Sequence, residues 1–126
     1  MGGSRATKAL PIQTPELVKM VGTADWCPLS DADHGQVTRA ILRDGRTLVV
    51  DMRWGGYTYS AALTRDADGS FHGGWTCRGA TDTGRVIARL YKSAAGDLLL
   101  GEWSEQGAKY HWWAQLSVVE HFEDER

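Results

Sequence analysis

The sequence predicts an all-β protein: an antiparallel up-and-down meander of seven or eight strands that forms a small barrel, preceded by one short N-terminal helix. Glycine-containing breaks divide the chain from Gln36 onward at regular intervals, close to the roughly 8 to 12 residues typical of consecutive hairpins. Between the breaks, apolar and polar residues alternate, as they do on strands with one buried face. Because no helix-length segment separates the strands, we expect every connection to join antiparallel neighbours.

The length of the chain fits a single domain with one core. Its 126 residues are enough to bury roughly two-thirds of the surface that the unfolded chain exposes. We expect a flexible leader over 1–12, one barrel domain over 13–119 and an acidic tail over 120–126. The tail, EHFEDER, carries four acids and one arginine, so we expect it to fray into solvent.

The N-terminal helix is expected over 14–21, in the stretch TPELVKMVG. Thr14 can cap it, Pro15 suits the first helical position, and the glycine that follows can end it. Its apolar residues make it a candidate lid or plug for the barrel. The stretch TADWCPLSDADHG over 23–35 reads as a turn-rich connector, in which Trp26 is the one large apolar anchor.

Six breaks delimit seven strands after the connector. We place these strands at 36–43, 46–54, 57–65, 70–78, 85–92, 97–104 and 108–118. Successive side chains on a strand point to alternate sides, so every second residue of a strand is assigned to the same face of the sheet. The expected inward set contains Leu48, Val50, Met52, Trp54, Tyr57, Tyr59, Ala61, Leu63, Phe71, Gly73, Trp75, Cys77, Tyr110, Trp112, Ala114 and Leu116.

Aromatic side chains dominate the expected interior. An eight-stranded barrel is just wide enough to be filled by side chains or to hold one small ligand. Buried tyrosine hydroxyls need hydrogen-bond partners, which favours a pocket over an all-apolar core. We therefore expect an interior pocket for a small apolar or aromatic molecule, with a solid core as the alternative. The expected ligand-binding residues are Trp54, Tyr57, Tyr59, Trp75, Trp103, Tyr110 and Trp112.

Two strands share an internal repeat. FHGGWTCRG over 71–79 and LLGEWSEQG over 99–107 both fit the pattern apolar-x-Gly-x-Trp-x-x-x-Gly. A glycine two residues before an inward Trp is typical of sharp strand coiling or of a space for a bulky ring. We expect Gly73 and Gly101 to accommodate neighbouring aromatic rings.

The meander of coiled strands with Gly-x-Trp motifs resembles, in style, the small up-and-down barrels of the calycin kind, such as the lipocalin-like and avidin-like families. In those families Gly-x-Trp lies near the first strand, whereas here it recurs in the fourth and sixth expected strands. We therefore carry no binding residue over from them, and the resemblance concerns the fold alone.

Charge and composition exclude several classes of partner. Fourteen Lys and Arg stand against sixteen Asp and Glu, and both signs are spread along the chain, which argues against binding to nucleic acid or to an anionic membrane. No apolar run is long enough to span a bilayer, and the first residues lack a signal-peptide core. We expect a soluble, cytoplasmic protein.

No motif supports catalysis, a metal or a cofactor. Nucleophile-elbow, zincin and phosphate-loop patterns are absent. Cys27 and His34, with His72 and Cys77, supply the residue types of a zinc site, but their spacing fits no compact zinc finger. We therefore expect no catalytic residue, no metal ligand and no cofactor. Whether the two cysteines pair with each other stays open.

The last strand contains adjacent tryptophans, Trp112 and Trp113, which cannot both face the core. Trp113 is expected on the outer face beside His111, where it is either covered by the N-terminal helix or exposed as an interface anchor. Three functions follow. The first is a small-molecule-binding barrel, and the second is an interaction module, homo-oligomeric or bound to another protein through His111 and Trp113. The third is a small enzyme with a His or Glu at the barrel mouth.

Overall fold

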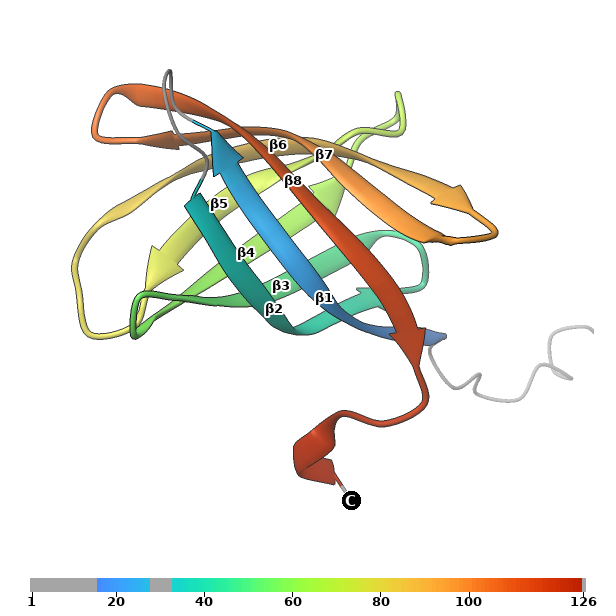
Figure 1. Cartoon of the computed structure of the whole chain (residues 1–126). Coiled ribbons are helices and arrows are strands. Elements are labelled where there is room, and N and C mark those ends of the chain that lie inside the picture. The colour runs from blue at the N-terminus through green and yellow to red at the C-terminus, as the bar shows by residue number, and fades with distance from the viewer. Residues whose placement is uncertain (1–15, 28–32, 126) are drawn as a thin grey trace, which may run out of the picture.

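The computed structural model describes residues 16–27 and 33–125, which form an eight-stranded closed barrel (Figure 1). Each strand pairs antiparallel with its neighbours in sequence, and the first strand pairs with the last to close the barrel. The strands are β1 (Leu17–Cys27), β2 (Asp33–Arg43), β3 (Thr47–Trp54), β4 (Tyr57–Arg65), β5 (Phe71–Cys77), β6 (Thr83–Ser93), β7 (Gly96–Glu105) and β8 (Ala108–Val119). The predicted antiparallel all-β barrel is confirmed, and a single 3-10 turn, η1 (Glu123–Glu125), follows it.

Tight hairpins explain why the chain turns where the glycines predict. Gly55 and Gly56, between β3 and β4, have φ angles of 57° and 84°. Gln106 and Gly107, between β7 and β8, have φ angles of 51° and 82°. Two consecutive residues with positive φ form the turn whose twist matches that of the flanking strands, and glycine adopts it without steric cost.

The predicted N-terminal helix is wrong. Leu17 to Val21 belong to β1, and Thr14 and Pro15 lie outside the described residues. The predicted connector is also wrong at its start, because β1 continues through Trp26, whose side chain is only 8% exposed. Pairing with both β2 and β8 satisfies the backbone of β1 along its length, and this tertiary gain outweighs a local capping signal.

The barrel interior separates into two halves by side-chain type. At the end where β1, β3, β5 and β7 finish, the interior and rim are aromatic, and we call this the aromatic end. It comprises Trp26, Trp54, Tyr57, Tyr59, Trp75, Trp103, Tyr110 and Trp112. The other half is filled mainly by aliphatic side chains, which include Met20, Leu42, Leu48, Leu63, Leu99 and Leu116.

Two residues that were predicted to point into the core are exposed. Trp54 is 37% exposed and Tyr57 is 54% exposed. They form the terminal cross-strand pair of the β3–β4 hairpin, so their inward positions lie at the rim, beyond the buried part of the core. The predicted burial of Leu48, Val50 and Met52 on the same strand is confirmed.

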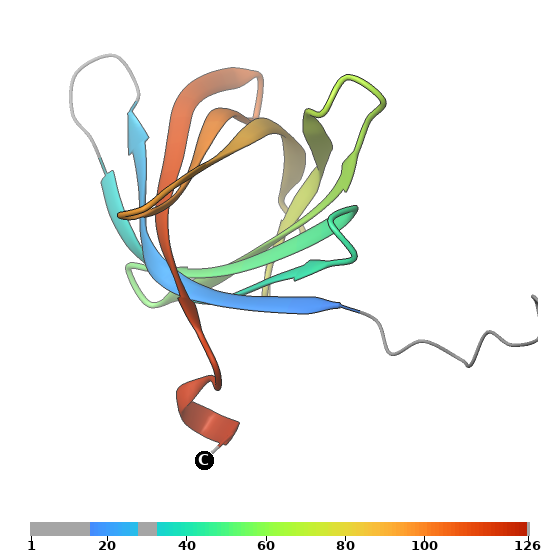
Figure 2. The same ribbon diagram turned by 90° about the vertical axis from the view of Figure 1, so that its right-hand side faces the viewer.

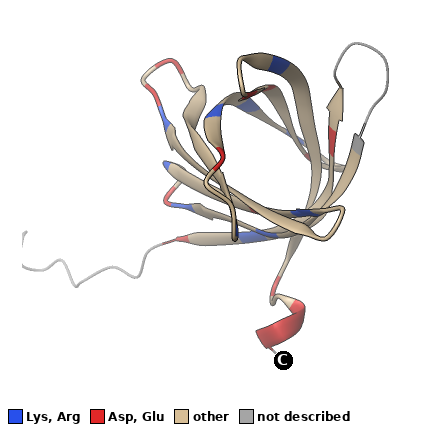
Figure 3. Cartoon of the chain, turned by 90° about the vertical axis from the view of Figure 1, so that its left-hand side faces the viewer, with Lys and Arg blue, Asp and Glu red and all other residues tan. Residues whose placement is uncertain are grey.

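The C-terminal tail does not fray as predicted. It leaves β8, forms η1 outside the barrel wall (Figure 2), and buries Phe122 to 2% exposure. Phe122 lies outside the main core cluster and contacts Lys19 and Arg39, which belong to β1 and β2. The acidic character of the turn is visible in Figure 3.

Candidate functional site

The centre of the aromatic end is a ring cluster around Trp103. Trp75 stacks on it with a centroid distance of 5.1 Å and an interplanar angle of 17°. Trp26 meets it edge-on at 5.6 Å, and Trp112 lies at 5.5 Å. These geometries are the ones that aromatic pairs prefer. Because Trp75, Trp103 and Trp112 are at most 1% exposed, the rings themselves fill this part of the barrel.

Glycines on neighbouring strands make room for the indoles. A Cβ at Gly84 on β6 would collide with the Trp75 ring and with the Ser104 carbonyl oxygen. With no Cβ there, the Trp75 indole N–H reaches across and donates to the Ser104 carbonyl at 2.7 Å. Gly35 on β2 does the same for Trp26, since a Cβ at Gly35 would lie 2.8 Å from that ring.

Gly73 and Gly101 serve a different purpose from the predicted one. A Cβ at either position would overlap the backbone carbonyl of the adjoining strand, at Ala62 and Ile87 respectively. They allow coiled strands to approach closely, and the prediction that they mainly accommodate aromatic rings is wrong. The inward orientation of Trp75 and Trp103 that the repeat predicted is confirmed.

Tyr59 links the buried indoles to the barrel rim. Its ring lies 5.6 Å from Trp75 and 6.2 Å from Trp103, and it lies 6.5 Å from the ring of Tyr57. Burial, followed by the neighbouring Cys77 and Glu105, raises the pKa of Tyr59 to about 12. The hydroxyl therefore stays protonated at neutral pH and can donate a hydrogen bond, but it cannot act as a base there.

The core holds one orphaned donor. Among the described residues, the indole N–H of Trp112 is buried and has no hydrogen-bond partner. Such a group is costly to bury, because it loses its contact with water without replacement. It is the one feature of the aromatic end that a purely structural cluster does not explain.

The structure brings most of the predicted ligand-binding residues together. Tyr59, Trp75, Trp103 and Trp112 share the ring cluster, and Tyr110 packs half-buried against the core. Trp54 and Tyr57 stand exposed at the rim. Sequence reasoning missed Trp26, although period two relates it to Ala24 and Met20, the buried residues earlier on the same strand.

The predicted interface residues lie on the outer wall, as expected. His111 is exposed and Trp113 is half-buried. Trp113 is paired across the strands with Leu100 on β7 and with Asp25 on β1. Flanking strands therefore surround it, and the helix that was expected to cover it does not exist in the described part of the chain.

Histidines outside the barrel pair with carboxylates. His34 contacts Asp25, and the His72 Nδ1 lies 2.8 Å from Asp66. Cys77, in contrast, is buried. Residues 16–27 and 33–125 contain no group of three or more His, Cys, Asp or Glu side chains able to hold a metal ion.

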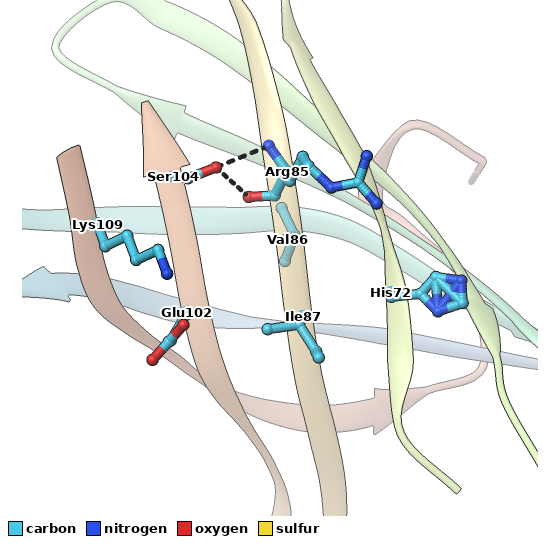
Figure 4. A pocket seen from close by; sticks show the side chains of 7 residues that line it. All are labelled: His72, Arg85, Val86, Ile87, Glu102, Ser104 and Lys109. Carbon is cyan, nitrogen blue, oxygen red and sulfur yellow. Dashed lines mark hydrogen bonds between the residues drawn. The ribbon is translucent and has the colours of Figure 1, made fainter. Parts of the chain in front are cut away.

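A shallow hollow of about 470 Å³ lies on the wall formed by β5 to β8 (Figure 4). Near its top the Ser104 hydroxyl accepts from the Arg85 amide at 3.1 Å and donates to the Arg85 carbonyl at 3.3 Å. The hollow is lined by His72, Arg85, Val86, Ile87, Glu102, Ser104 and Lys109. It mixes both signs of charge around Ile87 and defines no single ligand class, and sequence reasoning did not find it.

Comparisons with known proteins give no family for this chain. No protein-family model matches it, and no curated protein matches it. No helix in the described part of the chain is long and apolar enough to cross a membrane.

Proposed function

We propose that the aromatic end binds a small, neutral, planar apolar or aromatic molecule. The observation that carries this proposal is an unbroken series of ring contacts from solvent to core. Tyr57, which is 54% exposed, contacts Tyr59, and Tyr59 contacts Trp75 and Trp103. Exposed aromatic rings that continue a buried cluster offer a flat apolar surface on which another ring can stack.

The proposed ligand lies nearer the rim than a deep interior pocket would place it. The three central indoles contact one another and are almost completely buried, so they serve as the floor of the site. Trp54, Tyr57 and Tyr59 form the contact surface. This arrangement favours stacking over full enclosure, and we expect modest affinity because much of the ligand keeps its contact with water.

Hydrogen bonding narrows the ligand class further. Tyr59 is protonated at neutral pH because its pKa is about 12, so it can donate a hydrogen bond to the ligand. Deeper in the same end, the Trp112 indole N–H is buried without a hydrogen-bond partner. The Tyr59 hydroxyl therefore favours a ligand that carries a carbonyl, ether or hydroxyl oxygen as an acceptor.

Fluorescence titration with 2-naphthol tests this function. We expect saturable quenching of the tryptophan emission by 2-naphthol, and a weaker response to an aliphatic alcohol of similar size. Tyr57→Ala should weaken binding at least about fivefold, roughly 1 kcal/mol, because it removes a stacking surface. Tyr91→Ala is the matched control, since Tyr91 is 51% exposed on β6. Equal effects of the two variants, or no saturable binding, would refute the proposal.

A second function, that of an interaction module, has its own supporting observation. Exposed apolar side chains on β6 and β7 adjoin Trp113 through the Leu100–Trp113 pair. Ile87, Tyr91 and Leu100 are 48%, 51% and 46% exposed. Contiguous exposed apolar side chains mark contact surfaces.

Self-association measured by sedimentation tests this second function. Leu100→Glu should reduce association if the wall around Trp113 is the contact. Val49→Glu on β3 is the matched control, because Val49 is 41% exposed outside this surface. A monomer at all concentrations, with no effect of Leu100→Glu on any measured association, would leave ligand binding as the better account.

A further inference from the structure

The C-terminal tail occupies a defined surface on the outside of the barrel. Phe122 is 2% exposed, although none of its neighbours in the turn is buried. The Arg39 guanidinium lies 4.3 Å from the centre of its ring, and the Lys19 ammonium lies 5.6 Å from it. Two cations on adjacent strands thus hold one aromatic ring by cation–π contact.

Carboxylates that follow the ring add charge pairs to the same cations. The Arg39 Nη2 donates to both carboxylate oxygens of Asp124, at 2.8 and 2.9 Å. The Lys19 Nζ donates to Glu125 at 2.8 Å, and this bond is the first cause that lowers the pKa of the Glu125 carboxyl. The tail therefore presents to these two cations an aromatic residue followed by acids two and three positions later.

The tail does not fill this surface. A hollow of about 370 Å³ remains beside it, lined by Thr38, Arg39, Arg53, Phe122, Glu123 and Asp124. Within the part of the chain that the structure describes, Arg53 makes no ion pair. A cation without an anion beside a bound acidic segment is complementary to further negative charge.

We propose that Lys19, Thr38, Arg39 and Arg53 form a docking site for a segment of another protein that contains an aromatic residue followed by acidic residues. We call it the tail site. The chain's own Phe122–Glu125 segment occupies it in cis and acts as an internal competitor. The partner segment gains what the tail lacks, an acidic group opposite Arg53.

The ion pairs that hold the tail to the barrel are of a kind that breaks readily. Asp124 is 72% exposed, and Lys19 and Glu125 are 25% and 33% exposed, so water and salt screen both ion pairs. The barrel closes between β1 and β8 without any residue of the tail. Tail release therefore leaves the fold complete, and the apparent affinity for a partner is reduced by the fraction of time the tail is docked.

Fluorescence anisotropy with a labelled EHFEDER peptide tests the tail site. The full-length Phe122→Ala variant keeps the cations but loses the anchor of its own tail. We expect it to bind the peptide at least about tenfold more tightly than the native chain does, because the internal competitor is removed. The same peptide with its phenylalanine replaced by alanine should not bind, and binding should weaken as salt rises.

Matched cation variants locate the binding. In the Phe122→Ala background, Arg39→Ala should abolish peptide binding. Arg85→Ala should leave it unchanged, because Arg85 is an exposed arginine on β6. If near-UV circular dichroism shows that Phe122→Ala is not folded, the Asp124→Asn/Glu125→Gln double variant releases the tail while Phe122 is retained.

Three outcomes would overturn the proposal. The first is a folded, tail-released variant that binds the peptide no better than the native chain. The second is peptide binding that is unchanged by Arg39→Ala or by replacement of the peptide's phenylalanine with alanine. The third is a native dimer that dissociates on Phe122→Ala, which would assign the site to the tail of a second copy. None of these outcomes bears on ligand binding at the aromatic end, which 2-naphthol reports separately.

Discussion

At the scale of single residues, the absence of a side chain is as informative as its presence. Gly22 on β1 adjoins the Gln115 carbonyl, as Gly73 and Gly101 adjoin carbonyls on their own neighbouring strands. Gly84 adjoins the Ser104 carbonyl in the same way, and it also opens the path along which the Trp75 indole N–H reaches that carbonyl. The sequence pattern identified two of these glycines as special but could not distinguish their purposes, because the distinction depends on which strand lies alongside.

Gly84→Ala should destabilise the barrel by about 1 to 3 kcal/mol, the usual cost of forcing atoms into a packed core. The added methyl would meet the Trp75 ring and the Ser104 carbonyl, and backbone cannot move as a flexible side chain does. Gly74→Ala on β5 is the matched control. The Cβ added at Gly74 would lie 3.1 Å from its nearest neighbour, the Gly84 carbonyl oxygen. Urea unfolding measures both. Equal losses for the two variants would contradict this account of Gly84.

Tyr59 makes the free energy of unfolding depend on pH in the alkaline range. Its pKa is raised to about 12 from 10.0, so between these values the unfolded chain binds fewer protons than the folded one. The stabilisation is complete below pH 10 and is lost as the pH rises toward 12. Between about pH 9 and about pH 11.5, the unfolding free energy should fall more in the parent than in Tyr59→Phe. Identical pH profiles for the parent and Tyr59→Phe would disprove the effect.

At the scale of elements, the strands from β2 to β8 were predictable and β1 was not. Turn glycines with positive φ and period-two alternation are local signals, and they located the hairpins correctly. The stretch around Leu17 carries a local helix signal instead. Its inward positions include Gly22, which has no side chain, and Ala24, whose side chain is a methyl group, so the alternation that marks a strand is weak there.

An up-and-down meander also had to contain an even number of strands to close with antiparallel neighbours. With seven strands, the first and last would run parallel, so an eighth was needed from the N-terminal part of the chain. The pairing of β1 with β8 provides it. No local pattern reveals this pairing, because it joins residues about 90 positions apart, as in the Trp26–Trp112 pair.

Trp26→Ala distinguishes a core strand from a connector. Trp26 is 8% exposed and contacts Trp103 edge-on, so its loss should cost roughly 3 to 5 kcal/mol. Trp54→Ala, at the 37% exposed rim, should change the unfolding free energy by only about 0.5 kcal/mol. Thermal and urea unfolding give both values. A small effect of Trp26→Ala would mean that β1 is not part of the cooperative core.

The sequence predicted which residues form most of the aromatic site but not how deeply each of them is buried. The alternation correctly grouped Tyr59, Trp75 and Trp103, because side-chain direction on a strand is a local property. It could not show that their rings pack tightly against one another, nor that Trp54 and Tyr57 lie beyond the last covered pair. Both depend on where the neighbouring strands end. The docking of Phe122 was likewise invisible, since Lys19 and Arg39 lie far from it in sequence.

At the scale of the whole molecule, the barrel places aliphatic and aromatic side chains in different halves of its interior. One half of the interior is mainly aliphatic, and the other presents rings that extend from the core to solvent. The outer wall carries the tail site on β1, β2 and β3, and it carries the exposed apolar side chains of β6 and β7 next to Trp113 on β8. We expect a ligand at the aromatic end to leave both outer surfaces accessible.

The indole N–H signals of the six tryptophans test the central claim most directly, because each reports on a known place in the barrel. In a two-dimensional ¹⁵N–¹H spectrum titrated with 2-naphthol, we predict saturable shifts at Trp54 and Trp103 and at the orphaned Trp112 donor. Trp113, on the outer wall, should stay in place. Shifts confined to Trp113, or no shifts in any of the six signals, would contradict a ligand site at the aromatic end.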